Sequence, residues 1–166
     1  MATDYFQSTV SLYNDERYEG QIDTVEVGNS ISKVMTVGTI APGLAVAKGT
    51  AGNVKPYSAV GDVFGGVAVL TDTKAGTYNS EASPLYAINE TVPCRNFGSI
   101  VVLAESDVVE GANAFIRYAA GTGGTVIGSF RADADTATAK EEPTIKFAES
   151  ATAGSLVRVT ITQIMV

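Results

Sequence analysis

Apolar and polar positions along this 166-residue chain form the pattern of short β-strands separated by turns. The clearest stretch, residues 97–130, holds three apolar runs between glycine-containing turns. Residues 99–104 are apolar on both faces, which is typical of a strand with neighbours on either side, whereas residues 113–119 alternate between two faces. We therefore predict a β-meander over residues 97–130.

A hairpin is predicted over residues 43–57. Its first run, LAVAK, turns at residues 49–52 and returns through residues 53–55. Glycine reaches positive φ at no steric cost, so a glycine cluster between two β-rich runs favours a hairpin. The turn GTAGNV shares four of six residues with GTGGTV at 121–126. Internal duplication and chance both remain open, and a repeated hairpin suits a two-sheet sandwich or a closed barrel.

The remaining strands are predicted from shorter runs. Gly65 and Gly66 interrupt an apolar run that we place in the core, which indicates a bulge or a close backbone approach. At the other end of the chain Val157, Val159 and Ile161 share one face, so we expect the last segment to be a paired strand. The short runs are residues 22–27, 33–37, 63–70, 84–89, 91–95, 144–150 and 156–166.

Two polar segments stand apart from these runs. Residues 131–143, RADADTATAKEEP, have no apolar stripe, so we predict an exposed loop with room for a short helix. Residues 1–20 lack clear periodicity, and we predict an arm that precedes a β-domain over residues 21–166. Aromatic side chains are enriched where proteins meet, so those of the arm are candidate contacts with another subunit. Folding back onto their own domain is the alternative. These candidates are Tyr5, Phe6, Tyr13 and Tyr18.

The composition supports an all-β fold. Hydrophobic residues make up 45% of the chain and charged residues 17%, with seventeen glycines and no tryptophan. The length fits one domain with a real core. We predict a single-domain β-sandwich or jelly-roll-like barrel with an extended N-terminal arm.

Net charge and hydropathy argue against two classes of binding partner, nucleic acids and membranes. The net charge of −7 argues against nucleic acid, because affinity for nucleic acid comes mainly from basic residues that displace counterions. The apolar runs are too short to cross a membrane, so we expect no membrane partner. The first ten residues also lack the basic and apolar regions of a secretory signal peptide.

The inventory of reactive side chains is poor. The chain has no histidine, and Cys94 is its only cysteine, which we expect to be a buried or inert thiol. Asp133 and Asp135 begin like a calcium loop, but the glycine and the glutamate that such a loop requires are missing. We therefore predict no catalytic residue, no cofactor and no metal site, and we do not expect an enzyme.

Several short motifs occur in a fixed order along the chain. They are EGQI at 19–22, Pro42-Gly43, FGGVAV at 64–69, VPCRNFGSIVV at 92–102, GANAFIRY at 111–118, GSFRA at 128–132 and KFAESATAGSLVRVTI at 146–161. In this order they resemble the structural cement (decoration) proteins of tailed bacteriophages. The resemblance begins near residue 19 and covers most of the chain.

The resemblance implies a viral structural protein that binds the outer surface of an icosahedral head. It implies a homo-oligomer, dimer or trimer, that bridges neighbouring major capsid proteins and stabilises their contacts. The aromatic arm and the 131–143 segment depart from the family pattern. Two alternatives stay open: another β-rich virion component, such as a head fibre base or a tail tube protein, and a carbohydrate-binding β-sandwich.

Overall fold

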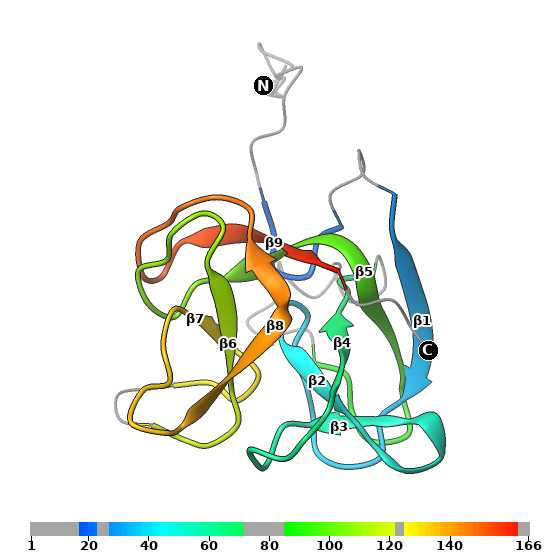
Figure 1. Cartoon of the computed structure of the whole chain (residues 1–166). Helices are drawn as coiled ribbons and strands as arrows, with labels where there is room; N and C mark the ends of the chain where they lie inside the picture. The colour runs from blue at the N-terminus through cyan, green and yellow to red at the C-terminus, as the bar shows by residue number, and fades with distance from the viewer. Residues whose placement is uncertain (1–16, 23–26, 72–84, 122–124, 163–166) are drawn as a thin grey trace, which may run out of the picture.

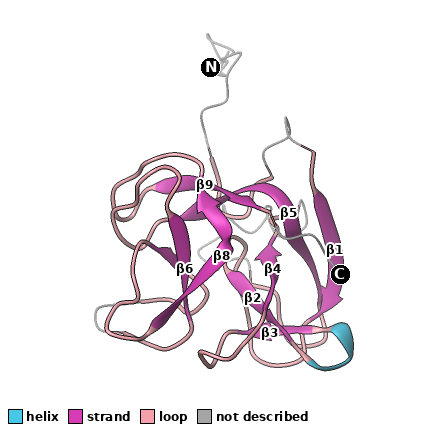
Figure 2. Cartoon of the chain, in the orientation of Figure 1, coloured by secondary structure: helices cyan, strands magenta, loops and turns pink. Residues whose placement is uncertain are grey.

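The structure is a computed structural model that describes residues 17–22, 27–71, 85–121 and 125–162. These residues form nine β-strands and one short 3-10 turn, η1, and the all-β prediction is confirmed (Figures 1 and 2). Within the described segments, no helix is long and apolar enough to cross a membrane. The elements are β1 Asn29–Val34, β2 Ala45–Lys48, η1 Thr50–Gly52, β3 Val54–Pro56, β4 Phe64–Ala68, β5 Thr91–Leu103, β6 Asn113–Arg117, β7 Phe130–Arg131, β8 Ala139–Phe147 and β9 Leu156–Ile161.

All nine strands belong to one sheet of order β3-β2-β4-β5-β9-β8-β6-β7, with β1 also paired to β5. The 13-residue strand β5 runs through both halves of this sheet. Its first part pairs with β1 and β4, and its second part pairs with β9. The change of partner falls at Gly98, where φ is +92° and an added Cβ would lie 2.9 Å from the Cα of Gly28. The sheet therefore has an N-terminal half and a C-terminal half joined by β5 (Figure 1).

Each half curls back on itself. In the C-terminal half, Ala104 at the end of β5 bridges Phe130 of β7 in parallel. In the N-terminal half, Met35 after β1 bridges Val54 of β3, also in parallel. The curled halves agree with the prediction of a sandwich or barrel.

The buried side chains form two clusters. Strand β2 separates them, because successive side chains of a strand point to opposite faces. Ala45 and Ala47 belong to the larger cluster, and Val46 belongs to the smaller one. The larger cluster holds, among others, Phe64, Val67, Ile100, Ile116, Phe130, Phe147 and Val159. The smaller cluster holds Met35, Ile40, Val46, Val54, Ala68, Tyr86, Val92 and Cys94.

Several predicted elements are confirmed. Strands β2 and β3 pair antiparallel across η1, as the hairpin prediction requires. Strand β4 is buried, and a Cβ on Gly66 would lie 2.8 Å from the Cβ of Cys94, which is the close approach expected there. Strand β9 is paired on both sides, with the expected apolar face buried.

The predicted β-meander is wrong. Strands β9 and β8 lie between β5 and β6, so the consecutive strands β5 and β6 are not neighbours. Ile100 of β5 is in register with Val159, and Ala114 of β6 is in register with Glu142. Turn residues indicate that the chain reverses direction after a strand. They do not indicate which other strand pairs with the edge of that strand.

Other boundaries also differ from the prediction. Residues 91–95 are the beginning of β5 rather than a separate strand, and residues 85–89 contribute only an isolated bridge between Tyr86 and Ile40. In the polar segment, residues 139–143 belong to β8, so a strand replaces the last five residues of the predicted loop. These residues form a strand because they pair with β6. Backbone N–H and C=O groups form such hydrogen bonds whether the side chains are polar or apolar.

A candidate binding groove between the two sheet halves

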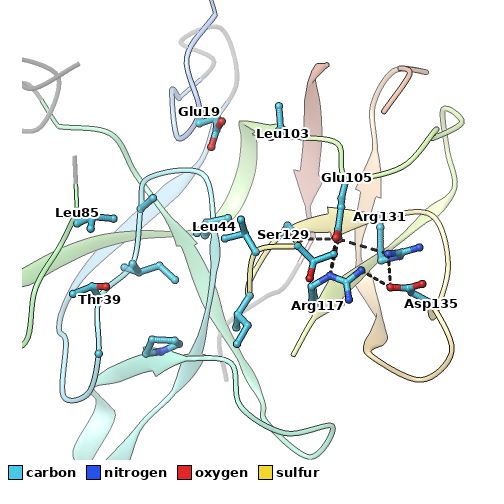
Figure 3. Close-up of a pocket in the computed structure, with 17 residues that line it drawn as sticks. Glu19, Thr39, Leu44, Leu85, Leu103, Glu105, Arg117, Ser129, Arg131 and Asp135 are labelled. Carbon is cyan, nitrogen blue, oxygen red and sulfur yellow. Dashed lines mark hydrogen bonds and ion pairs between the residues drawn. The ribbon is translucent and has the colours of Figure 1, made fainter. Parts of the chain in front are cut away.

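A groove with a volume of about 950 Å³ opens between the two halves of the sheet. Figure 3 shows one wall carrying Thr39 and Leu85 and the other carrying a group of charged side chains. Residues from the N-terminal half that line it are Gly38, Thr39, Ile40, Ala41, Leu44, Pro56 and Leu85, and Glu19 lies at its edge. Residues from the C-terminal half are Leu103, Glu105, Arg117, Thr125, Val126, Ile127, Ser129, Arg131 and Asp135.

Glu19 is held at this edge by a tight backbone contact. The next residue, Gly20, donates its N–H to the carbonyl of Val101 and accepts from the N–H of Leu70, both at 2.8 Å. Its φ is +78°, and an added Cβ would lie 2.7 Å from the backbone nitrogen of Gly43. Two motifs singled out in the sequence, EGQI and Pro42-Gly43, therefore pack against each other beside the groove.

The charged wall is organised around Arg117 of β6, whose side chain is fully buried. Its Nε donates to both carboxylate oxygens of Glu105, at 2.8 and 2.9 Å. One terminal nitrogen donates to Asp135 at 2.5 Å, and the other donates to Thr138 Oγ1 at 2.7 Å. A buried guanidinium is tolerated when it is paired and hydrogen-bonded in this way.

The GSFRA motif completes the wall and ties it to the other half. Ser129 Oγ donates to Glu105 at 2.8 Å, and Arg131 lies 3.0 Å from a carboxylate oxygen of Asp135. The carbonyl of Gly128 accepts from the N–H of Ala45 in β2, at 2.8 Å. The motif thus links the ionic network to the N-terminal half of the sheet.

The pKa values of the network follow from these contacts. Burial alone would lower the pKa of Arg117, but the hydrogen bonds to Glu105 and Asp135 outweigh it and raise that pKa. The hydrogen bond from Arg117 lowers the pKa of Asp135 below its ordinary value of 3.8. A lowered carboxyl pKa contributes stability above the unfolded-state value, and this is lost as the pH falls through the folded-state value.

The rest of the rim is apolar and exposed. Leu85, Leu103 and Val126 are 43%, 37% and 51% exposed, and all three line the groove. Large apolar side chains exposed around a concave surface are typical of an interaction site. The groove therefore combines an apolar rim with a charged wall.

Of the candidate contacts predicted from the sequence, Tyr18 alone falls within the described residues, and it does not line the groove. Tyr5, Phe6 and Tyr13 fall outside the described residues. Tyr18 is 40% exposed, and its backbone N–H donates to Gln21 Oε1 at 3.0 Å. The contact role of these four aromatic residues stays a prediction.

Cys94 and the acidic pair can be placed. Cys94 is buried, as predicted, and burial raises the pKa of its thiol to about 12. Asp133 and Asp135 were expected in a solvated loop, but Asp135 is half-buried and paired with Arg117. Among the described residues, no group of three or more cysteine, aspartate or glutamate side chains is placed to hold a metal ion.

Sequence reasoning missed the groove and its network. The alternation over residues 113–119 places Arg117 on the face opposite Ala114 and Ile116, and this pattern gives no sign that the arginine is buried. An arginine inside an otherwise apolar strand was the only local signal. Its partners Glu105 and Asp135 are 12 and 18 residues away, a separation at which sequence periodicity carries no information.

Two solved structures are similar to this chain. The capsid of Myoviridae Phage XM1 contains a chain similar over 97% of this chain and 99% of that one, with a TM-score of 0.73 and 15% identity. The head fiber gp8.5 N base of bacteriophage phi29 is similar over 81% of this chain and 94% of that one, with a TM-score of 0.48 and 16% identity. No curated protein sequence matches the chain.

The model of one protein family, described as structural cement protein (E217 gp24/Pam3 gp6), matches residues 6–162. The match covers most of the chain, including every described strand. The chain therefore belongs to the phage structural cement protein family, and its role is that of a capsid cement or decoration protein.

Proposed function

We propose that the protein binds the outer surface of an assembled phage head as a homo-oligomer, dimer or trimer, and stabilises contacts between neighbouring major capsid proteins. Its role is mechanical rather than catalytic. The observation that carries the proposal is the groove, whose exposed Leu85, Leu103 and Val126 offer apolar area to a protein partner. The net charge of −7 supports the outer surface, because packaged nucleic acid repels an acidic protein from the inside.

Binding to heads tests the function directly. Heads assembled without this protein should bind it saturably and carry it through sedimentation in a fixed ratio to the major capsid protein. Decorated heads should then release their contents at a higher temperature, by an amount that grows with the ratio of protein concentration to dissociation constant. Undecorated heads that survive heating and osmotic shock equally well would contradict the cement role.

We further propose that the arm, residues 1–20, contributes contacts with a neighbouring cement or capsid subunit through Tyr5, Phe6, Tyr13 and Tyr18. Removing residues 1–16 leaves Arg17 and its ion pair with Glu149 in place. The shortened protein should keep its melting temperature within about 2 °C, because no side chain of the described core is removed. It should bind undecorated heads at least about tenfold more weakly, which is about 1.4 kcal/mol.

A full-length variant controls for the loss of chain length. Replacing Tyr5, Phe6 and Tyr13 with serine keeps the backbone and removes only the aromatic area. It should weaken head binding as the truncation does. A large fall in melting temperature with head binding retained would instead place the aromatic side chains in the core of their own domain.

A further inference from the structure

Glu19 is the exception among the carboxylates that line the groove. Glu105 and Asp135 are each held by Arg117 and by further donors. Glu19 has no hydrogen bond or ion pair with any residue in the described ranges, and Figure 3 shows its carboxylate directed toward Leu44 and the groove. It is half-buried, and this burial raises the pKa of its carboxyl group.

The position of Glu19 is rigid as well as unpaired. The Gly20 backbone is bonded to Val101 and Leu70, and an added Cβ on Gly43 would lie 2.7 Å from the Cβ of Glu19. A desolvated carboxylate without a donor costs stability unless a partner supplies one. Such a group, fixed at the edge of an open cavity, is prepared for a cation that the described residues do not provide.

The groove also suits a peptide segment better than a single ion. Its volume of about 950 Å³ lies at the upper end of ordinary ligand pockets. Leu85, Leu103 and Val126 line the same space as Glu19. An occupant that covers these side chains must be apolar next to its positive charge.

We propose that the groove is the docking site for a segment of the major capsid protein that presents a lysine or arginine between apolar side chains. The cation pairs with Glu19, and its neighbours cover Leu85, Leu103 and Val126. Charge complementarity favours this occupant, because the groove places the carboxylate of Glu19, which has no cation partner in the described ranges, beside exposed apolar side chains. The proposal rests on the proposed binding to heads.

Substituting Glu19 tests the charge. Glu19→Gln should weaken binding to undecorated heads about tenfold and Glu19→Lys more than about 100-fold, since a like charge facing the incoming cation repels it. Glu110→Gln is the matched control, because Glu110 is exposed and outside the groove, and it should bind within about twofold of wild type. The melting temperature of Glu19→Gln should not fall, because the substitution removes a desolvated charge that pairs with nothing in the described fold.

A second pair of variants tests the apolar rim. Val126→Ser removes an exposed valine inside the groove, and Val109→Ser removes one outside it, with 51% and 66% of each residue exposed. Head binding should weaken about fivefold or more for Val126→Ser and stay unchanged for Val109→Ser. Equal binding by these two variants would overturn the groove as the docking site.

The outcomes separate this inference from the function on which it rests. Wild-type protein that fails to sediment with heads overturns the proposed function. Wild-type binding together with unchanged binding by Glu19→Gln overturns the inference alone. If Glu19→Gln instead changes self-association of the free protein in sedimentation velocity, the occupant is a second copy and the inference is wrong.

Discussion

Replacing Arg117 with methionine is expected to lower the free energy of unfolding by about 3–5 kcal/mol, the usual cost of removing one member of a buried ion pair. The methionine keeps much of the apolar volume of the side chain but leaves Glu105 and Asp135 without their main donor. Glu105 is affected most, because only 16% of its side chain is exposed and water cannot replace the lost hydrogen bonds fully. Urea unfolding followed by fluorescence or circular dichroism measures the change.

Two further variants control this result. Lys48→Met makes the same kind of substitution at an exposed position and should change stability by less than about 0.5 kcal/mol. Adding Glu105→Gln to Arg117→Met removes the stranded carboxylate, so the double variant should be more stable than Arg117→Met alone. If Arg117→Met and Lys48→Met unfold at the same urea concentration, the network has no structural role.

Replacing Gly20 with alanine is expected to lower the free energy of unfolding by about 2–5 kcal/mol. A positive φ costs an L-residue about 1–2 kcal/mol. Overpacking costs a further 1–3 kcal/mol or so, because the new Cβ would lie 2.7 to 2.8 Å from Gly43 N, Leu70 N and Pro42 Cβ. Two of these three atoms belong to the backbone, so no rotation of a side chain relieves the contact. Thermal and urea unfolding both report the loss.

Gly111 offers a matched control for this substitution. Its φ is +80°, close to that of Gly20, but nothing lies within 4 Å of an added Cβ. Gly111→Ala should therefore lower the free energy of unfolding only by the cost of a positive φ, about 1–2 kcal/mol. Equal losses for the two variants would show that the contact between the EGQI segment and Pro42-Gly43 is not tightly packed.

These predictions concern one region because the motifs that are conspicuous in the sequence meet there. Gly20 and Gly43 position one edge of the groove, while Ser129 and Arg131 of the GSFRA motif belong to the opposite wall. Stability and binding then come from different side chains of that region. Arg117 holds the wall together, whereas Glu19 is the proposed contact with a partner.

The sequence by itself determined several of the strands and the apolar faces of those strands. Alternation in β9, the hairpin of β2 and β3 and the glycine pair of β4 are local patterns, and the structure confirms each. Such patterns succeed because side chains alternate across a strand whatever its partner is. The all-β class follows from the same local information.

Only the tertiary structure decided which strands are neighbours and which charges are buried. Strand β9 separates β5 from the rest of the predicted meander, and β8 extends into a segment that reads as an exposed loop. Arg117 is buried because Glu105 from the loop after β5 and Asp135 and Thr138 from the loop between β7 and β8 converge on it. Strand pairing and ion pairing depend on groups far apart along the chain, whereas hydrophobic periodicity reports only on each segment by itself.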